Sequence, residues 1–153
     1  MLEFSEANVA FSLDVPDSQE VIRVLADKLC AQGLVSKDYG RLTYERELEH
    51  PTGLPTTPFC IAFPHADADG VIQSALAIAL LKKPVFFKNM ADPDEELEVH
   101  IVVMLANKNP EEQIQTLRNL ALLFGEPEKL SKLRDQSSPR EVVAWLKREL
   151  RLS

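Results

Sequence analysis

Residues 60–65 read Cys-Ile-Ala-Phe-Pro-His, a short apolar run that stops at Pro64 and ends on His65. The run predicts a short strand over residues 59–63, because apolar runs of this length that end in turn residues are typical of strands. Pro64 lacks a backbone N–H and has a fixed φ, so it ends strand pairing and steadies the backbone that follows. The strand would therefore offer the His65 imidazole at its mouth to a substrate or a partner.

Longer apolar runs downstream predict the rest of a sheet. Residues 75–81 and 99–106 are almost uniformly apolar, which is typical of strands that are buried on both faces. Residues 85–87 predict a further strand, separated from the first of these by a turn at Lys83-Pro84. The acidic segment 92–96 is interpreted as an exposed loop, because clusters of like charge are usually solvated.

Helical periodicity and capping residues predict five helices around these strands. The expected spans are 17–32, from 36 to just before Pro51, 109–124, 127–134 and 138–151. The buried stripe expected for the third helix consists of Ile114, Leu117, Leu120, Ala121 and Phe124. Strands mixed with helices, without repeats or linkers, predict a single three-layer α/β domain over residues 1–153.

Charge and composition exclude several classes of function. The chain has a formal net charge of -7, which argues against a nucleic-acid partner because phosphate-backbone binding needs a concentrated basic face. Residues 1–18 lack the features of a signal peptide, and no apolar run approaches the roughly 20 residues of a membrane helix. Cys30 and Cys60 are interpreted as small buried side chains in a reducing compartment. We therefore expect a cytoplasmic protein without direct membrane insertion.

The sequence predicts no cofactor and no metal. It contains no G-x-G-x-x-G, Walker or H-E-x-x-H pattern. A metal site built from His50, His65, Asp67 and Asp69 would lack regular ligand spacing, and His50 is interpreted mainly as a loop residue. A Cys60–His65 dyad is excluded, because five positions along an extended strand separate the side chains by roughly 16 Å.

An imidazole and a guanidinium are the side chains that suit phosphoryl transfer. An imidazole with an ordinary pKa of about 6.5 is largely neutral at cytosolic pH, so one ring nitrogen of His65 can attack a phosphoryl group. The equatorial oxygens need charge stabilisation, and a guanidinium has the best shape for it. Arg46 is the candidate, although pairing with Glu45 or Glu49 on a helix surface is the alternative. His100 is expected to be a hydrogen-bonded core histidine.

The combination of Arg46-Glu47, Thr52-Gly53 and Ile61-Ala62-Phe63-Pro64-His65 resembles the IIA component of the sugar phosphotransferase system, fructose/mannitol class (type 2), and most nearly its galactitol-type members. The resemblance implies a mixed sheet between helices. It also implies that His65 accepts a phosphoryl group through Nε2 from the phosphohistidine of HPr. His65 would then pass the group to a cysteine of a sugar-specific IIB component, which works with a IIC component.

The resemblance also suggests roles for neighbouring residues. Mannitol-type members carry a second active-site histidine at the start of the helix after the last long strand, where this chain has Gln113. Gln113 could hydrogen-bond a phosphoryl oxygen or the ring, but it carries no charge, so Arg46 is expected to supply most of the charge stabilisation. Glu47 is expected to orient Arg46 or the imidazole, and Thr52 and Gly53 to form a loop of the site.

Two other functions remain open from the sequence. One is a regulatory module whose phosphorylation state is read by a partner protein. Regulatory relatives of the nitrogen type usually keep Thr-Gly-Ile-Gly where this chain has Thr52-Gly53-Leu54-Pro55, which favours the phosphocarrier. The other is a stand-alone hydrolase with His65 as base, which would lack both a nucleophile partner and a metal set.

Overall fold

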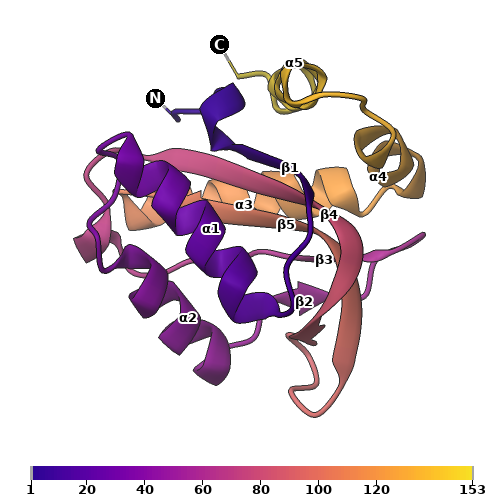
Figure 1. Cartoon of the computed structure of the whole chain (residues 1–153), viewed down its shortest axis with the longest axis horizontal. Coiled ribbons are helices and arrows are strands. Elements are labelled where there is room, and N and C mark those ends of the chain that lie inside the picture. The colour runs from indigo at the N-terminus through magenta and orange to yellow at the C-terminus, as the bar shows by residue number, and fades with distance from the viewer. Residues whose placement is uncertain (1, 153) are drawn as a thin grey trace.

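The computed structural model describes residues 2–152, and its centre is a five-stranded mixed sheet (Figure 1). The strands lie in the order β1-β4-β5-β3-β2. The pairs β1–β4 and β5–β3 are parallel, whereas β4–β5 and β3–β2 are antiparallel. The strand bounds are β1 Val9–Leu13, β2 Gly53–Leu54, β3 Cys60–Ala62, β4 Ala75–Lys88 and β5 Glu96–Ala106.

Helices cover both faces of this sheet (Figure 1). One face packs against α1 and α2, and the other against α3, α4 and α5, each through its own cluster of buried apolar side chains. The helix bounds are α1 Ser18–Ala31, α2 Tyr39–Glu49, α3 Pro110–Phe124, α4 Pro127–Arg134 and α5 Pro139–Leu150, with short 3₁₀ turns at Glu6–Asn8 and Ala68–Gly70. The predicted three-layer α/β architecture with a mixed sheet is confirmed.

Strand β4 shows why two helical layers fit on one sheet. Its even-numbered residues Leu76, Ile78 and Leu80 belong to the cluster beneath α3, α4 and α5. Its odd-numbered alanines, among them Ala77, belong to the cluster beneath α1. Side chains alternate between faces along a strand, so large residues fill one layer while small ones let α1 lie close to the other.

The predicted turn at Lys83-Pro84 is wrong, because β4 continues through it. Leu80 pairs with Ile101 and Val85 pairs with Val99, so β4 bulges between these two points. Proline is tolerated at a bulge or on a sheet edge, where its missing N–H costs no ladder bond. The pairing of β1 with β4 ends at Leu81, which leaves residue 84 on such an edge.

Other boundaries differ from the sequence prediction in smaller ways. Helix α2 begins at Tyr39 rather than residue 36, β5 starts at Glu96, within the expected acidic loop, and β1 and β2 were not predicted. In α3 the buried residues are Leu120, Leu123 and Phe124, whereas Ile114 is 61% exposed and Ala121 is exposed. Only the second half of α3 packs on the sheet side, which turns Ile114 to solvent. Cys30 and Cys60 are half-buried and free.

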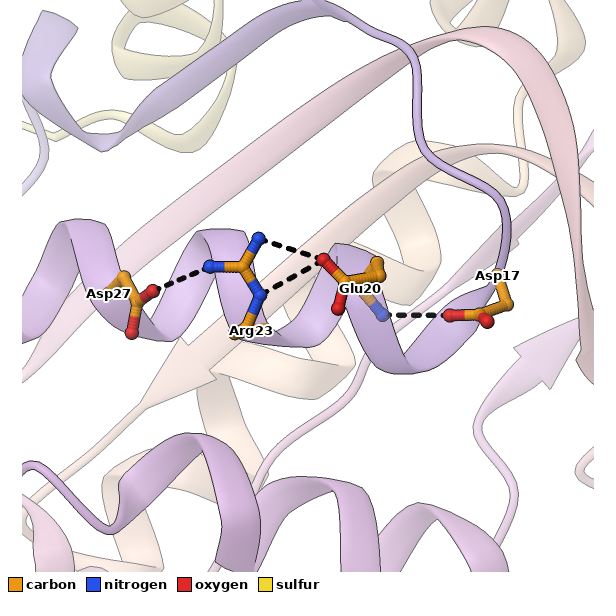
Figure 2. Close-up of polar contacts among 4 residues, drawn as sticks. All are labelled: Asp17, Glu20, Arg23 and Asp27. Atoms are coloured by element: carbon orange, nitrogen blue, oxygen red, sulfur yellow. Dashed lines mark hydrogen bonds and ion pairs between the residues drawn. The ribbon is translucent and has the colours of Figure 1, made fainter.

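Helix α1 illustrates how an outward face is built (Figure 2). The Asp17 side chain caps the helix by accepting a hydrogen bond from the Glu20 N–H. Arg23 bridges Glu20 and Asp27 with N···O distances of 2.8 and 2.9 Å. Exposed pairs of this kind contribute little to stability, because water and salt screen the charges. The face stabilises α1 modestly and lies outside the site described below.

Within residues 2–152 no helix is both long and apolar enough to cross a lipid bilayer.

Candidate functional site

His65 lies just beyond β3, at the edge of the sheet where the parallel strands β3 and β5 end. It forms an isolated parallel bridge with Leu105, near the end of β5, and the Leu105 N–H donates to the Pro64 carbonyl at 3.3 Å. The carboxyl ends of parallel strands commonly form binding crevices in α/β proteins. The predicted strand end and the position of His65 at its mouth are thus confirmed.

The His65 ring is held in one orientation. Its Nδ1 lies 2.8 Å from the Phe63 carbonyl oxygen, and because a carbonyl can only accept, Nδ1 carries the hydrogen. The other nitrogen, Nε2, then has the free lone pair in the neutral ring. Phe63 is itself anchored, since its ring stacks on Phe124 of α3 with centroids 5.9 Å apart. The fixed carbonyl therefore selects the tautomer in which Nε2 is the nucleophilic atom.

Burial lowers the pKa of His65 below its ordinary value. The hydrogen bond to the Phe63 carbonyl opposes this effect, the positive charge of Arg46 reinforces it, and Asp67 opposes it. Desolvation disfavours the charged imidazolium more than the neutral ring. His65 is therefore neutral at physiological pH, in the state that can act as a nucleophile.

A buried chain of hydrogen bonds supports the segment before His65. The Glu47 carboxyl accepts the Thr52 N–H at 2.8 Å and the Thr52 hydroxyl at 2.7 Å. The Thr52 Oγ1 in turn accepts the Phe63 N–H at 3.2 Å. Glu47 and Thr52 are 8% and 3% exposed. Glu47 therefore acts on the backbone that presents His65, and the hydrogen bonds of residues 2–152 include none from Glu47 to Arg46 or to the imidazole.

The burial of Glu47 has an electrostatic consequence. Desolvation raises its pKa to about 7, even though both Thr52 donors and the charge of Arg46 lower it. A carboxyl removed from water favours its neutral form, and hydrogen bonds to the charged form compensate only in part. Glu47 therefore changes charge near neutral pH, directly behind the His65 segment.

Gly53 has a steric role that follows from its position in β2. A Cβ at this residue would lie 2.5 Å from the Lys88 carbonyl oxygen of β4. The Gly53 carbonyl also accepts the Met90 N–H at 2.8 Å. The backbones approach so closely that only glycine fits. Thr52-Gly53 thus supports the site from behind and does not face the cleft.

Arg46 points its guanidinium toward the segment that follows His65. Its Nη1 lies 3.6 Å from Asp67 Oδ1, and its buried Nε has no hydrogen-bond partner among residues 2–152. The ion pairs of residues 2–152 include neither alternative pairing, with Glu45 or with Glu49, and Glu45 pairs instead with Arg41 at 3.1 Å. A single exposed contact at this distance holds an arginine weakly. Arg46 therefore keeps unused donors beside the imidazole.

A cleft of about 360 Å³ opens beside Arg46 and the segment that follows His65, and His65 itself is not among its lining residues. Arg46 and His50 line it from the end of α2, and Ala66 and Asp67 line it from the segment after His65. A tetrahedral oxyanion is small enough to enter a space of this size, but the carboxylates of Glu45, Glu49, Asp67 and Asp69 also line it, so an anion would have to bind at the Arg46 guanidinium. His50 is exposed at the rim.

Gln113 lies at the same end of the sheet, in the first turn of α3, which follows β5. It is half-buried, and its N–H donates to the Asn109 carbonyl at 3.0 Å. No hydrogen bond joins it to His65 among the described residues. In the same part of the chain, no group of three or more histidine, cysteine, aspartate or glutamate side chains is arranged to hold a metal.

Tyr39 is a site neighbour that sequence reasoning missed. It is the first residue of α2 and is fully buried. Its hydroxyl donates to the Leu105 carbonyl at 2.9 Å and accepts the Ala66 N–H at 3.2 Å. In the sequence Tyr39 reads as an ordinary core aromatic at a helix start. Only the fold brings it to the backbone next to His65.

His100 differs from the expected hydrogen-bonded core histidine. It is half-buried, and its Nδ1 has no hydrogen-bond partner. Its ring lies against Phe59 with centroids 5.2 Å apart. The guanidinium of Arg134 packs over the same Phe59 ring. Burial lowers the pKa of His100 and the charge of Arg134 lowers it further, whereas a weak contact with the Glu98 backbone and the Glu98 charge oppose this effect.

Known proteins share this sequence and architecture. Residues 3–149 match the family described as "Phosphoenolpyruvate-dependent sugar phosphotransferase system, EIIA 2". The galactitol-specific EIIA component of the phosphotransferase system in Escherichia coli is 32% identical over 109 residues, which cover 71% of this chain and 70% of that protein. The transcriptional regulator ManR of Bacillus subtilis is 33% identical over 129 residues, which cover 83% of this chain and 18% of the regulator.

A solved structure shows the same fold. The complex of enzyme IIAMTL with phosphorylated enzyme IIBMTL from Escherichia coli contains a chain that matches with a TM-score of 0.78 at 21% identity, covering 99% of both chains. The family match over nearly the whole chain and the identity to the galactitol-specific relative agree with each other. The chain belongs to the type-2 EIIA family of the phosphoenolpyruvate-dependent sugar phosphotransferase system.

Proposed function

We propose that this chain is a histidine phosphocarrier that accepts a phosphoryl group on Nε2 of His65 and passes it to a cysteine of a sugar-specific IIB component. The observation that carries the proposal is the 2.8 Å contact between His65 Nδ1 and the Phe63 carbonyl oxygen. This contact leaves the Nε2 lone pair free for attack. We further propose that HPr is the donor and that the chain works as one EIIA domain.

The chemistry follows from this geometry. The Nε2 lone pair of His65 forms a bond to phosphorus while the phosphorus–nitrogen bond of the donor phosphohistidine breaks, and the electron pair of that bond returns to the donor ring. His65 then carries a positive charge shared with Nδ1–H, which the Phe63 carbonyl stabilises. In the second step a cysteine thiolate attacks phosphorus, and the His65 ring leaves as neutral imidazole.

Arg46 is proposed to stabilise the equatorial oxygens in both steps. Among residues 2–152 its Nε has no hydrogen-bond partner and its only ion pair is the 3.6 Å contact with Asp67, so it can turn to an incoming phosphoryl group at little cost. Positioned cations of this kind provide most of the catalysis in phosphoryl transfer. Gln113, which lies at the same end of the sheet, is proposed as a neutral hydrogen-bond donor to a phosphoryl oxygen.

The comparisons support a IIB component as the acceptor. The solved relative with the same fold is in complex with a phosphorylated IIB enzyme, and a 32% identical relative is galactitol-specific. We therefore propose a galactitol-type or related IIB partner, together with its IIC component.

A regulatory role is the second candidate, because a similar segment makes up 18% of the transcriptional regulator ManR. In that case the phosphorylation state of His65 would be read by a partner protein. Both functions need a phosphorylatable His65, and they differ in whether the phosphoryl group moves on to a cysteine.

Intact mass spectrometry tests the proposal. Wild-type protein and the His65→Ala variant are incubated with phosphoenolpyruvate, Enzyme I and HPr, with His100→Ala as a matched control. We expect one acid-labile phosphoryl group on the wild type and on the control, and none on His65→Ala. Absence of phosphorylation on well-folded wild type would overturn the phosphocarrier function. Addition of a galactitol-type IIB should then remove the phosphoryl group, and its retention would favour the regulatory role.

A further inference from the structure

The Tyr39 hydroxyl connects two backbone segments at the site. It donates to the Leu105 carbonyl at 2.9 Å and accepts the Ala66 N–H at 3.2 Å, so both of its hydrogen-bonding directions are used. The side chain is 0% exposed. Burial raises the pKa of Tyr39 to about 12, so the hydroxyl stays protonated and remains a donor at any physiological pH.

The two partners of Tyr39 are the nearest backbone neighbours of His65. Ala66 follows His65 directly, and Leu105 is the residue that bridges to it on β5. The Leu105 N–H also donates to the Pro64 carbonyl at 3.3 Å. The backbone after His65 is thus tied to Leu105 through Tyr39, and the backbone before it is tied to Leu105 directly.

Helix α2 therefore holds the His65 segment from both sides. Tyr39, its first residue, holds the Ala66 side, whereas Glu47, near its other end, holds Phe63 through Thr52. The Ala66 amide plane determines the ψ angle of His65, which in turn directs the imidazole. A ring that turns would lose its alignment with the Phe63 carbonyl and move Nε2 away from Arg46.

We propose that Tyr39 is a positioning residue for phosphoryl transfer, whose hydroxyl fixes the backbone that aims the His65 imidazole. The inference rests on the proposed role of His65 as phosphoryl acceptor. Tyr39 does not touch the phosphoryl group, and its effect passes through Ala66 and Leu105. A hydroxyl that served only core stability would leave the ring orientation and the transfer rate unchanged once the protein is folded.

The test compares Tyr39→Phe with Tyr44→Phe. Both deletions remove one hydroxyl from a tyrosine of α2, and among the hydrogen bonds of residues 2–152 none involves the Tyr44 hydroxyl. The first readout is the imidazole ¹⁵N spectrum of the unphosphorylated protein, which reports the tautomer and the pKa of His65. The second is the rate of phosphoryl transfer from phosphorylated HPr, analysed as separate kcat and KM values.

We expect Tyr39→Phe to reduce the fraction of His65 in the Nδ1–H tautomer and to lower kcat about tenfold. The KM for phosphorylated HPr should change less than about twofold, because a misaligned imidazole slows the chemical step without weakening the docking of HPr. Tyr44→Phe should match the wild type in both readouts. A folded Tyr39→Phe protein with wild-type ¹⁵N shifts and kcat would overturn the proposal.

The role of Tyr39 can still be tested if phosphorylation fails or if the Tyr39→Phe variant does not fold. If wild-type protein accepts no phosphoryl group, the proposed function fails, but the ¹⁵N readout still decides whether Tyr39 orients His65. If Tyr39→Phe does not fold, 3-fluorotyrosine in the Tyr44→Phe background places fluorine only at position 39. Fluorine weakens the hydroxyl as an acceptor, so the His65 ring resonances should shift relative to the unlabelled Tyr44→Phe protein. Unchanged resonances would contradict the proposal.

Discussion

His65 and His100 lie near neighbouring strands and share several properties, yet only one has the features of a nucleophile. Both are half-buried, and burial is the main cause of a lowered pKa in each, with a nearby arginine as a second cause. The difference is in the ring contacts. His65 Nδ1 donates to a fixed carbonyl at 2.8 Å, whereas His100 Nδ1 has no partner.

The arginines near the two histidines, Arg46 and Arg134, also differ in their surroundings. Arg46 lines an open cleft with an unpartnered Nε, whereas Arg134 lies over the Phe59 ring, with its guanidinium carbon 4.9 Å from the ring centroid. A lowered pKa is thus a poor marker of a functional histidine in this protein. The fixed tautomer of His65 beside the weakly held Arg46 is the better support for the proposed site, because together they would prepare the attacking atom and the charge stabilisation.

The largest expected difference is between His65→Ala and His100→Ala. The first variant should lose phosphoryl acceptance completely, because no other side chain at the site offers a held imidazole. The second should accept phosphoryl at a rate within about twofold of wild type, since His100 is far from the reacting atoms along β5. Quench-flow measurement with phosphorylated HPr compares them, and a comparable loss in both variants would remove the distinction.

The two arginines give the next largest difference. Arg46→Ala should slow transfer about a hundredfold, the usual cost of removing one transition-state donor. Arg46→Lys should recover only part of this, because a point charge cannot make a bidentate contact. Arg134→Ala serves as the matched control and should lower only stability, by about 0.5–1 kcal/mol, through the lost contact with Phe59. Rapid transfer by Arg46→Ala would contradict the role of this residue.

Substitutions at Thr52 test how the Phe63 backbone is supported, whose carbonyl accepts the hydrogen bond from His65 Nδ1. Thr52→Val keeps the shape but removes the hydroxyl that joins Glu47 to the Phe63 N–H. We expect about tenfold slower transfer and a free energy of unfolding lower by about 1–3 kcal/mol, because buried donors lose their partners. Thr52→Ser keeps the hydroxyl and should behave almost as wild type. Equal rates for the two variants would show that the hydroxyl does not matter for transfer.

Glu47→Gln should have the smallest effect on transfer and a clear effect on the pH dependence of stability. The folded pKa of about 7 lies above the unfolded value of 4.5. Stability from the neutral carboxyl is therefore fully present below pH 4.5 and is lost as pH rises through about 7, a change on the order of 3 kcal/mol. Glutamine does not titrate, so this loss should vanish in the variant.

His65 and His100 change the free energy of unfolding with pH in the opposite direction to Glu47, so a pH series can tell their contribution apart from that of Glu47. Their folded pKa values lie below 6.5, so their contribution is present above pH 6.5 and is lost as pH falls through the folded values. Urea unfolding of wild type, Glu47→Gln and His100→Ala from pH 4.5 to 8 separates the contribution of Glu47 from that of the histidines. A wild-type minus Glu47→Gln difference that does not vary with pH would contradict the raised pKa of Glu47.

Patterns local in sequence made most of the elements predictable. Asp17, Asn109 and Ser138 cap helices as their side-chain chemistry indicates, because a cap needs only the next two or three residues. The apolar runs of β4 and β5 likewise predicted buried strands. Strand β1 was missed because it forms through pairing with the distant β4, and β2 because a strand of two residues leaves no periodic pattern in the sequence. Pro84 was misread because an edge position, which makes proline harmless there, depends on where β1 ends.

The sequence by itself determined the residue types of the site and the family resemblance, since His65, Arg46 and Glu47 stand in a recognisable order close to each other in the chain. Tertiary structure alone decided what these residues contact. Glu47 reaches the backbone of Phe63 through Thr52, and Tyr39 reaches Leu105, 66 residues away along the chain. Such contacts form between separate elements, so their specificity comes from how α2 packs on the sheet and not from any local pattern.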